Sequence, residues 1–428
     1  MASSIASSAR SLKSTLRHAL AAKMIHAACR DSGHAWRVRT LDPVTTVWLF
    51  ALQMLHANTA CTHVLRLMPG IRATDSAYCQ ARKRLPLKVF QRLFQRVRDH
   101  VLPATDEMLS LWRGHRVFYI DGSTTSTPDT PGLQKLFGQP AGQKPGCGFP
   151  AATLVGLFRS SGLLVDLLIK PLRTHEASIA HLLFKHLKPN DLLVGDRAFS
   201  SYVLVASLQQ RGAHAVMRLH QRRKTDFRRG RYLGVRDRLV RWAKPPRRPD
   251  WMDEETFDSL PTEMTLRQVE YQVEIRGYRS QKVVLVTTLF DAEQYPKKEL
   301  ASLYGDRWQV ETYFRHLKQS MRMDVLRCKT PDGVKKELWM FGIIYNLVRS
   351  VMVEAAQRQG VKPDRISFID TLRWLTLRRA GEPLPVLGVN PHRPGRVQPR
   401  VVKRRPKQYS LMTRPRDQMI KAMTGWKR

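Results

Sequence analysis

Four residues with ionisable or hydrogen-bonding side chains recur at a regular spacing in one stretch of this sequence. They are Tyr304, Arg307, Glu311 and Lys318. At about 100° per residue of an α-helix, these positions fall within an arc of roughly 60°. A carboxylate flanked by two cations and a phenol on one helix face could bind a metal ion beside a phosphate group. The alternative is a solvated helix edge with an Arg307–Glu311 pair that contributes only a few tenths of a kcal/mol.

The stretch that carries these residues, 300–321, contains no proline and a single glycine, which predicts one continuous helix. Apolar residues recur in it at helical spacing and form a stripe beside the polar arc: Leu303, Val310, Phe314, Leu317 and Met321. We therefore expect this helix to dock through its apolar stripe and to present the polar arc along its flank.

Two further acids directly follow short apolar runs that predict buried strands. Asp121 follows residues 117–120, and Asp196 follows residues 192–195. In α/β sheets of this kind, ligands and catalytic groups gather at the carboxyl ends of strands. Together with Glu311, these acids could surround two divalent cations, which in two-metal sites lie about 3.5–4 Å apart and serve phosphoryl transfer. Oxygen ligands favour Mg²⁺ or Mn²⁺. Taken singly, each Asp can be explained as a turn or cap residue, and for Asp121-Gly122 alone that explanation is the better one.

Other candidate ligands carry less weight. His175 and Glu176 could bind a metal, but the polar first turn of a helix explains them better. Cys147 has no His or Cys partner at ligand spacing, and the glycines around it do not continue into a phosphate-binding motif. The five cysteines include no CxxC pair, so the sequence supports neither a zinc site nor a disulfide framework.

The composition points to a polyanionic partner. The 428 residues include 73 Lys and Arg against 35 Asp and Glu, a formal net charge of +38. Such an excess most simply indicates nucleic acid. No run of about 20 apolar residues predicts a membrane span. The acid-free first thirty residues are similar to a transit peptide, but a basic DNA-binding arm explains them as well, and we expect a cytoplasmic, nucleoid-associated protein.

The order of predicted elements indicates an α/β fold in several parts. Short cation-rich helices come first, then three strands in series followed by helix, strand, helix and strand, which predicts a sheet with mixed strand directions. We expect a helical DNA-binding domain over residues 1–110 and the first part of the core over 111–220. A basic, β-rich insertion follows over 221–295, the second part of the core over 296–360, and a C-terminal helix and basic tail over 361–428.

The motifs Ile120-Asp121-Gly122-Ser123 and Gly195-Asp196-Arg197, with the Y-(2)-R-(3)-E-(6)-K pattern, resemble the insertion-sequence-four family of DDE transposases. The resemblance covers roughly residues 40–425. It implies an RNase H-like core with a β-strand insertion before the glutamate, and two Mg²⁺ or Mn²⁺ ions bound by Asp121, Asp196 and Glu311. It also implies DNA contacts near the cleaved end by Arg197, Tyr304, Arg307 and Lys318.

The implied function is DNA transposition, by metal-dependent phosphodiester hydrolysis and strand transfer at insertion-sequence ends. Double-stranded DNA, as transposon ends and target, is the implied partner, and a homodimer would hold two ends. Two alternatives stay open. One is an RNase H-like nuclease or resolvase that cuts without joining. The other is a DNA-binding protein that has lost catalysis, although the presence of all three carboxylates argues against it.

One departure from part of the family concerns hairpin formation. Some relatives seal each transposon end as a hairpin and stack a flipped base on a tryptophan of the strand before the signature helix. The corresponding stretch here, residues 282–286, has no aromatic residue. If hairpins form, the sequence predicts that Trp242, Trp251 or Tyr278 of the insertion stacks the base. Trp242 and Trp251 could equally anchor a small core.

Overall fold

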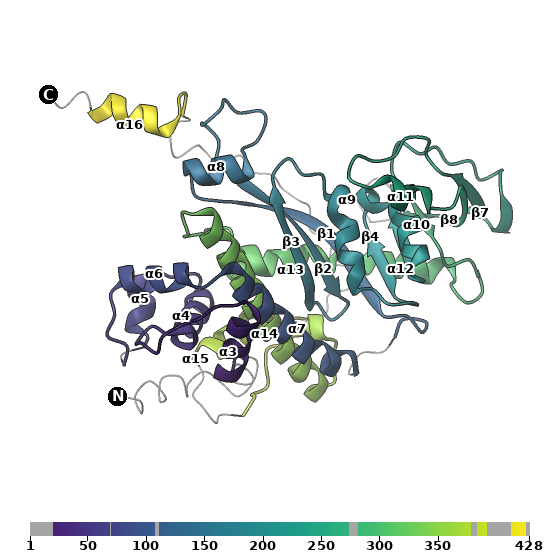
Figure 1. Cartoon of the computed structure of the whole chain (residues 1–428). Helices are drawn as coiled ribbons and strands as arrows, with labels where there is room; N and C mark the ends of the chain where they lie inside the picture. The colour runs from purple at the N-terminus through teal and green to yellow at the C-terminus, as the bar shows by residue number, and fades with distance from the viewer. Residues whose placement is uncertain are drawn as a thin grey trace.

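The computed structural model describes residues 20–68, 70–107, 111–273, 281–377, 383–391 and 412–424. A nine-stranded mixed sheet runs through the molecule in the order β3-β2-β1-β4-β5-β9-β8-β7-β6, and helices cover its faces (Figure 1). The strands are β1 (Val117–Ser126), β2 (Ala151–Arg159), β3 (Leu164–Pro171), β4 (Leu192–Gly195), β5 (His214–Arg218), β6 (Arg231–Gly234), β7 (Asp237–Ala243), β8 (Glu263–Val273) and β9 (Gln281–Thr287).

Helices precede, interrupt and follow the strands. The N-terminal group comprises α3 (Ala22–Asp31), α4 (Pro43–Leu55), α5 (Cys61–Arg66), α6 (Asp75–Arg84) and α7 (Leu87–Glu107). Between strands lie α8 (Pro131–Phe137), α9 (Glu176–Ile179), α10 (Tyr202–Gln210) and α11 (Glu254–Asp258), with 3-10 turns η1 (Ala180–His186) and η2 (Arg197–Phe199). The last group is α12 (Lys297–Asp306), α13 (Gln309–Arg315), the π-helical η3 (His316–Ser320), α14 (Pro331–Arg358), the 3-10 turn η4 (Pro363–Arg365), α15 (Phe368–Leu377) and α16 (Arg416–Thr424).

Strand β1 shows how the sheet separates two apolar cores. Its residues point alternately to opposite faces, as the pleat of a strand requires. Val117 and Tyr119 join the core formed with the N-terminal helices, α13, α14 and α15, whereas Phe118 and Ile120 join the core formed with α9, α10 and α11. This alternation decides on which face each later residue of the strand lies.

Strand directions place three carboxyl ends at one edge of the sheet. Strands β1, β2 and β3 form an antiparallel meander, and β4 and β5 run parallel to β1. Because β3 is antiparallel to β2, it runs in the same direction as β1. The segments that follow β1, β3 and β4 therefore leave the sheet on the same side.

Helix α14 is the buried axis of the helical half. Asn346 donates to Leu164 O and accepts from Leu164 N, both at 2.8 Å, so the helix hydrogen-bonds directly to the start of β3. Phe94 of α7 packs edge-on against Trp339, with ring centroids 5.0 Å apart. Of the described helices, only α14 is long and apolar enough to cross a membrane, but 89% of its most apolar window is buried inside the protein.

The basic stretch after β5 adds to the sheet. Strands β6, β7 and β8 extend it beyond β9, and β9 pairs with both β5 and β8, so the sheet is continuous. Arg267 of β8 is fully buried and pairs with Asp237 of β7 at 2.5 Å while donating to Tyr295 O at 2.8 Å. This ion pair ties the added strands to the segment that leads into α12.

Several elements differ from those expected. Strand β1 continues to Ser126, so Asp121 lies inside it instead of after it. The expected helix over 176–187 is one α-helical turn followed by a 3-10 segment. The loop expected over 128–150 contains α8, because Thr130 caps a helix that begins with Pro131. In the tail, expected to be extended, residues 416–424 are helical, while residues 392–411 and the first nineteen lie outside the described residues.

Candidate active site

The parallel pairing of β1 and β4 places Asp121 beside Asp196. Ile120 is in register with Gly195, and each aspartate is the next residue of its chain. Neighbouring strands lie about 4.8 Å apart. Asp121 is in step with Tyr119, and Asp196 with Val194, both of which face the core beneath α13 and α14. The two carboxylates therefore belong to one edge and are oriented to the face on which the signature helix packs.

Asp121 is held in an environment that disfavours its charge. Its Oδ1 accepts from Gly122 N at 2.9 Å, and Arg307 Nη1 lies 3.5 Å from its Oδ2. Burial raises the pKa of Asp121 to about 6; Arg307 opposes the rise, and the carboxylates of Asp196 and Glu311 add to it. The single positive charge of Arg307 does not neutralise the negative charges of these three acids. The site can therefore accept a further cation.

Asp196 begins the turn that follows β4. Its Oδ1 accepts from Ala198 N at 2.7 Å and so caps the 3-10 turn η2. Arg197, the next residue, is exposed and donates to Gln221 Oε1 at 2.6 Å, at the start of the insertion. Arg197 is thus hydrogen-bonded to the start of the basic stretch, one residue from Asp196.

The signature helix is not continuous, which corrects the expectation of one helix over 300–321. The amides of Arg307 and Trp308 bond three residues back, to Tyr304 O and Gly305 O, so α12 ends and α13 begins at this tight turn. Residues 316–320 then form a π-helix. The arc of roughly 60° assumed an unbroken helix, so it does not describe these side chains. Tight or wide turns inside helices are frequent at functional sites.

Glycine on the sheet allows α13 to approach Asp121. Gly156 of β2 is the register partner of Asp121. A Cβ there would lie 2.5 Å from Phe158 and 3.1 Å from Phe314, one turn along α13 from Glu311. Any larger residue would push the helix away from the strand. The close packing brings Glu311 to the site edge, where its side chain is 47% exposed and its Oε1 lies 3.9 Å from Arg307 Nη2.

The remaining predicted residues of the signature segment differ in how deeply their side chains are buried. Tyr304 is buried with Arg307 Cζ 5.6 Å from its ring centroid, and burial raises its pKa. Lys318 Nζ donates to Ser123 Oγ at 3.3 Å. Ser123 is two residues after Asp121 on the same face of β1. The structure thus places Arg307, Glu311 and Lys318 of the signature segment along β1 beside Asp121, whereas the contact of Arg197 is with Gln221.

A buried brace behind α13 holds it in place. Arg349 of α14 has no solvent-exposed surface and pairs with Asp364 at 2.7 Å, and it also donates to Ser161 O. Tyr313 of α13 donates to the same Asp364 at 3.1 Å. This brace links α13, α14 and the turn between β2 and β3. The helix that carries Glu311 is therefore held in place by its packing against these elements.

Sequence reasoning set aside one acid that the structure brings to this edge. Glu176, the first residue of α9, lies against Gly122: a Cβ on Gly122 would be 1.9 Å from Glu176 Cδ. Burial, the larger cause, and the carboxylates of Asp121 and Asp196 together raise the pKa of Glu176 to about 7. The signal was present in the strand directions, because residues that follow the third strand of a meander return to the edge at which the first strand ends.

The donor set fits a divalent cation, although it is not closed around one. Asp121, Asp196, Glu311 and Glu176 offer only carboxylate oxygens, the ligands that Mg²⁺ and Mn²⁺ prefer. Within the ranges that the structure describes, no three acidic, histidine or cysteine side chains converge tightly enough to hold an ion. Glu311 is the most exposed of the predicted set, so a rotation of its side chain is the simplest way to close the site.

Comparison with known proteins identifies the class to which this chain belongs. The family model for the transposase DDE domain matches residues 112–347, which is more than half of the chain and includes every predicted site residue. The chain therefore belongs to the family of transposases that carry a DDE domain. This confirms the class of protein and the function in insertion-sequence transposition that the motifs predicted.

Individual relatives extend the comparison. Transposase InsG for insertion sequence element IS4, from Escherichia coli strain K12, is 28% identical over 401 residues, covering 87% of this chain and 88% of that protein. The putative transposase InsZ of the same strain is 30% identical over 142 residues, covering 32% and 47%. A piggyBac transposase, solved as a synaptic complex with hairpin DNA, covers 84% of this chain and 78% of that one at 11% identity, but its TM-score of 0.45 is too low to support a conclusion.

Proposed function

We propose that Asp121, Asp196 and Glu311 form the catalytic centre of a transposase that hydrolyses and then joins DNA strands at insertion-sequence ends. The observation that carries this proposal is the register of β1 with β4, which sets the two aspartates side by side at the edge beneath α13. Three antiparallel strands followed by two parallel ones, with Glu311 on a later helix, also support an RNase H-like core.

The chain's own residues supply positioning and charge. Two Mg²⁺ or Mn²⁺ ions, when bound, would activate a water and stabilise the leaving oxygen in phosphoryl transfer. Asp121 and Asp196 would hold them from the sheet, and Glu311 from α13. Arg307, once it is released from Asp121, would bind a phosphate oxygen of the DNA. Lys318, on the same face as Asp121, would bind a phosphate nearby and align the scissile bond.

The same residues in the same roles would serve strand joining as well as strand cleavage. Hydrolysis at the transposon end leaves a 3′-hydroxyl, and that hydroxyl attacks a second phosphodiester in the opposite strand or in the target. One phosphodiester forms as another breaks, so no external energy source is required. Arg197, exposed and directed to Gln221, would contact DNA that runs along the start of the insertion.

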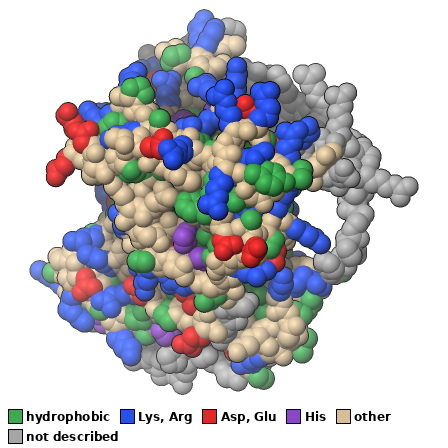
Figure 2. All heavy atoms as spheres, turned by 90° about the vertical axis from the view of Figure 1, so that its right-hand side faces the viewer, with side chains coloured by type: hydrophobic (Ala, Val, Ile, Leu, Met, Phe, Trp, Pro, Cys, Tyr) green, Lys and Arg blue, Asp and Glu red, His purple; other side chains and the backbone are tan. Residues whose placement is uncertain are grey.

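The distribution of charge supports double-stranded DNA as the partner. Figure 2 shows Lys and Arg side chains spread over the face that includes the insertion, with acidic side chains in small groups. Exposed cations of the insertion include Arg222, Lys224, Arg228, Arg229, Arg231 and Arg241. We assign DNA binding to the N-terminal helices, residues 1–110, and to the insertion, residues 221–295, with the core formed by 111–220 and 296–360 and the C-terminal helix and tail by 361–428. A homodimer that holds two ends completes the proposal.

A cleavage and joining assay on duplex DNA that carries the element's ends tests this function. Asp121→Asn, Asp196→Asn and Glu311→Gln are each expected to abolish cleavage in Mg²⁺ or Mn²⁺ while binding to the ends persists. The reason is that the carboxylates hold the metal ions, whereas Lys and Arg side chains hold the DNA phosphates. Glu354→Gln, an exposed acid paired with Arg358 on α14, is the matched control and should cleave normally. Wild-type turnover by any of the three site variants would overturn the assignment.

The products separate the alternatives. Cleaved ends joined to target DNA support a transposase, whereas cut DNA with no joined product at any metal concentration indicates a nuclease or resolvase. Specific binding with no cleavage indicates a DNA-binding protein. Sedimentation of the protein with one and two ends per complex tests the dimer.

A further inference from the structure

We infer that Glu176 is a fourth carboxylate of the catalytic centre and binds a divalent cation together with Asp121 and Asp196. This inference rests on the proposed function, which already places cations at that edge. It adds a ligand that the three-carboxylate motif of the family name does not include. Three observations carry it: the position of α9, the close approach of Glu176 to Gly122, and the lack of a side-chain partner for this carboxylate among the described residues.

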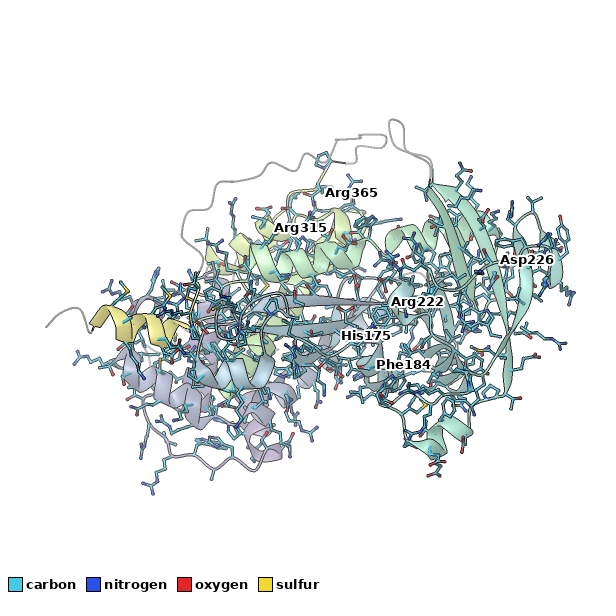
Figure 3. All side chains as sticks on the ribbon, turned by 90° about the horizontal axis from the view of Figure 1, so that it is seen from above. His175, Phe184, Arg222, Asp226, Arg315 and Arg365 are labelled. Atoms are coloured by element: carbon cyan, nitrogen blue, oxygen red, sulfur yellow. The ribbon has the colours of Figure 1, made fainter. Side chains whose placement is uncertain are left out.

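The position of α9 follows from the meander. β3 runs parallel to β1 and ends at Pro171, so the chain returns to the edge where β1 and β4 end. Five residues later Glu176 begins α9. In Figure 3 its neighbour His175 lies near the middle of the molecule, whereas Asp226 lies at the outer end of the insertion.

Gly122 provides the space that Glu176 occupies. A Cβ on Gly122 would lie 1.9–2.2 Å from all three atoms of the Glu176 carboxyl group, distances that no side chain tolerates. The carboxyl group therefore fills the place of the missing side chain, next in sequence to Asp121. This close approach gives the glycine of the Asp121-Gly122 pair a function that a turn does not explain, because Gly122 lies inside β1.

Glu176 and Glu311 reach the aspartates from opposite faces of the sheet. Gly122 is in step with Phe118 and Ile120, whose core also includes Ile179 of α9. Val310 and Phe314 of α13 belong to the other core. β1 continues past Asp121 whereas β4 ends at Gly195, so the sheet is open there and both faces have access to the pair of aspartates.

No structural role accounts for this carboxylate. Among the described residues the side-chain carboxylate of Glu176 makes no hydrogen bond or ion pair, although the residue is half-buried. It does not cap α9 either, because His175 accepts from Ala177 N at 3.3 Å and fills that role. A half-buried carboxylate that faces two others and has no cation of the protein beside it is suited to bind a metal cation.

Calorimetric measurement of Mn²⁺ binding to the full chain, in the absence of DNA, tests the inference independently of activity. Glu176→Gln is expected to weaken Mn²⁺ binding by about tenfold or more, or to remove one bound ion. In EDTA the same variant should melt at the wild-type temperature or above, because it removes repulsion and leaves the packing intact. Gly122→Ala should reproduce the binding defect, since its Cβ displaces Glu176. Glu354→Gln should change neither property.

The outcomes separate this inference from the proposed function. If Asp196→Asn loses Mn²⁺ binding while Glu176→Gln binds Mn²⁺ like wild type, only the role of Glu176 is overturned. Wild-type Mn²⁺ binding by Asp196→Asn overturns the catalytic centre itself. A Glu176→Gln protein that melts lower in EDTA but binds Mn²⁺ normally shows a purely structural residue and also overturns the inference. If that variant fails to fold, Glu176→Asp, which keeps the carboxylate, replaces it and should bind Mn²⁺ more weakly than wild type.

Discussion

Arg307 Nη1 lies 3.5 Å from Asp121 Oδ2, and its other terminal nitrogen, Nη2, lies 3.9 Å from Glu311 Oε1. Both Arg307 and Asp121 are largely buried, with side chains 15% and 17% exposed. Arg307 Nε is also buried without a hydrogen-bond partner in the part of the chain that the structure describes. This residue thus stabilises the acidic edge when no other cation is present, and it retains a donor for a ligand.

Arg307→Ala should therefore affect both stability and catalysis. Removing the guanidinium leaves the Asp121 and Glu311 carboxylates uncompensated, and we expect a loss of about 1–3 kcal/mol in the free energy of unfolding without metal, less than breaking a tightly buried ion pair costs. The cleavage rate should fall by about 100-fold or more because the scissile phosphate is misplaced. Urea unfolding and single-turnover cleavage measure the two effects.

Lys318→Ala is the comparison for that variant. Among the described residues, the Lys318 ammonium group hydrogen-bonds only to Ser123 Oγ, so its loss should slow cleavage with little change in stability. Normal kinetics with reduced stability in Arg307→Ala would instead show that Arg307 is only a structural partner of Asp121 and Glu311.

Charge on the insertion should control the salt dependence of DNA binding. Each neutralised phosphate contributes about −0.9 to the slope of log K against log salt. Arg222 and Lys224 are exposed and make no ion pair among the residues that the structure describes. Changing both to Ala should make the slope shallower by up to about 1.8. Arg358→Ala, on α14, is the control for lost charge. An unchanged slope in the double variant would mean that these cations do not meet DNA.

Trp251 is the better candidate for stacking a flipped base. Trp242 is 5% exposed, lies in the core with Phe257 and Met264, and carries Arg223 over its ring at 3.7 Å, so it anchors the insertion. Trp251 is partly exposed, is stacked on His181 at 4.6 Å, and lines a groove with Arg247 and Arg248. Tyr278 lies outside the described residues.

If hairpins form at the ends, Trp251→Ala should remove them, because stacking contributes about 1–3 kcal/mol per base against the cost of unpairing. Products of an end-containing duplex are resolved on a denaturing gel. Trp242→Ala should instead lower the free energy of unfolding by about 3–5 kcal/mol. Hairpins that persist in Trp251→Ala would exclude this stacking role, and their absence in wild type would indicate another route for cutting the second strand.

His316 should make stability depend on pH. It lies in the π-helix of the signature segment and stacks on Phe368 of α15 with ring centroids 4.1 Å apart. Burial, the largest cause, together with the charges of Arg349 and Arg315, lowers its pKa from 6.5 to about 3. Because the unfolded chain binds the proton more readily, the contribution of neutral His316 is present above pH 6.5 and is lost as the pH falls toward 3.

Urea unfolding at pH 7 and pH 5 measures this effect. Over that interval wild type should lose about 2 kcal/mol more than His316→Phe, which keeps the stack but cannot be protonated. The same pH difference in both proteins would show that His316 is protonated as readily in the folded chain as in the unfolded one.

The sequence by itself determined the family of this protein and supplied the candidate residues of its site. Residue types at local spacings supplied Asp121, Asp196 and Glu311 as candidates, and the spacing from Tyr304 to Lys318 identified the family, since such motifs depend only on order along the chain. Strand and helix patterns also predicted a mixed sheet, because the alternation of apolar residues reflects local backbone geometry. The net charge predicted a polyanionic partner.

Only the tertiary structure decided how these residues meet. The break at Arg307 and the π-helix at 316–320 arise where α12 and α13 adapt to the sheet, and helical periodicity carries no information about such packing. The pairing of Ile120 with Gly195 is a contact between residues 75 positions apart, so no local spacing encodes it. The approach of Glu176 to Gly122 depends in the same way on the direction of β3 and on α9 packing against the opposite face. Long-range packing therefore decided which acids lie near one another at the candidate site, after local sequence had supplied the candidates.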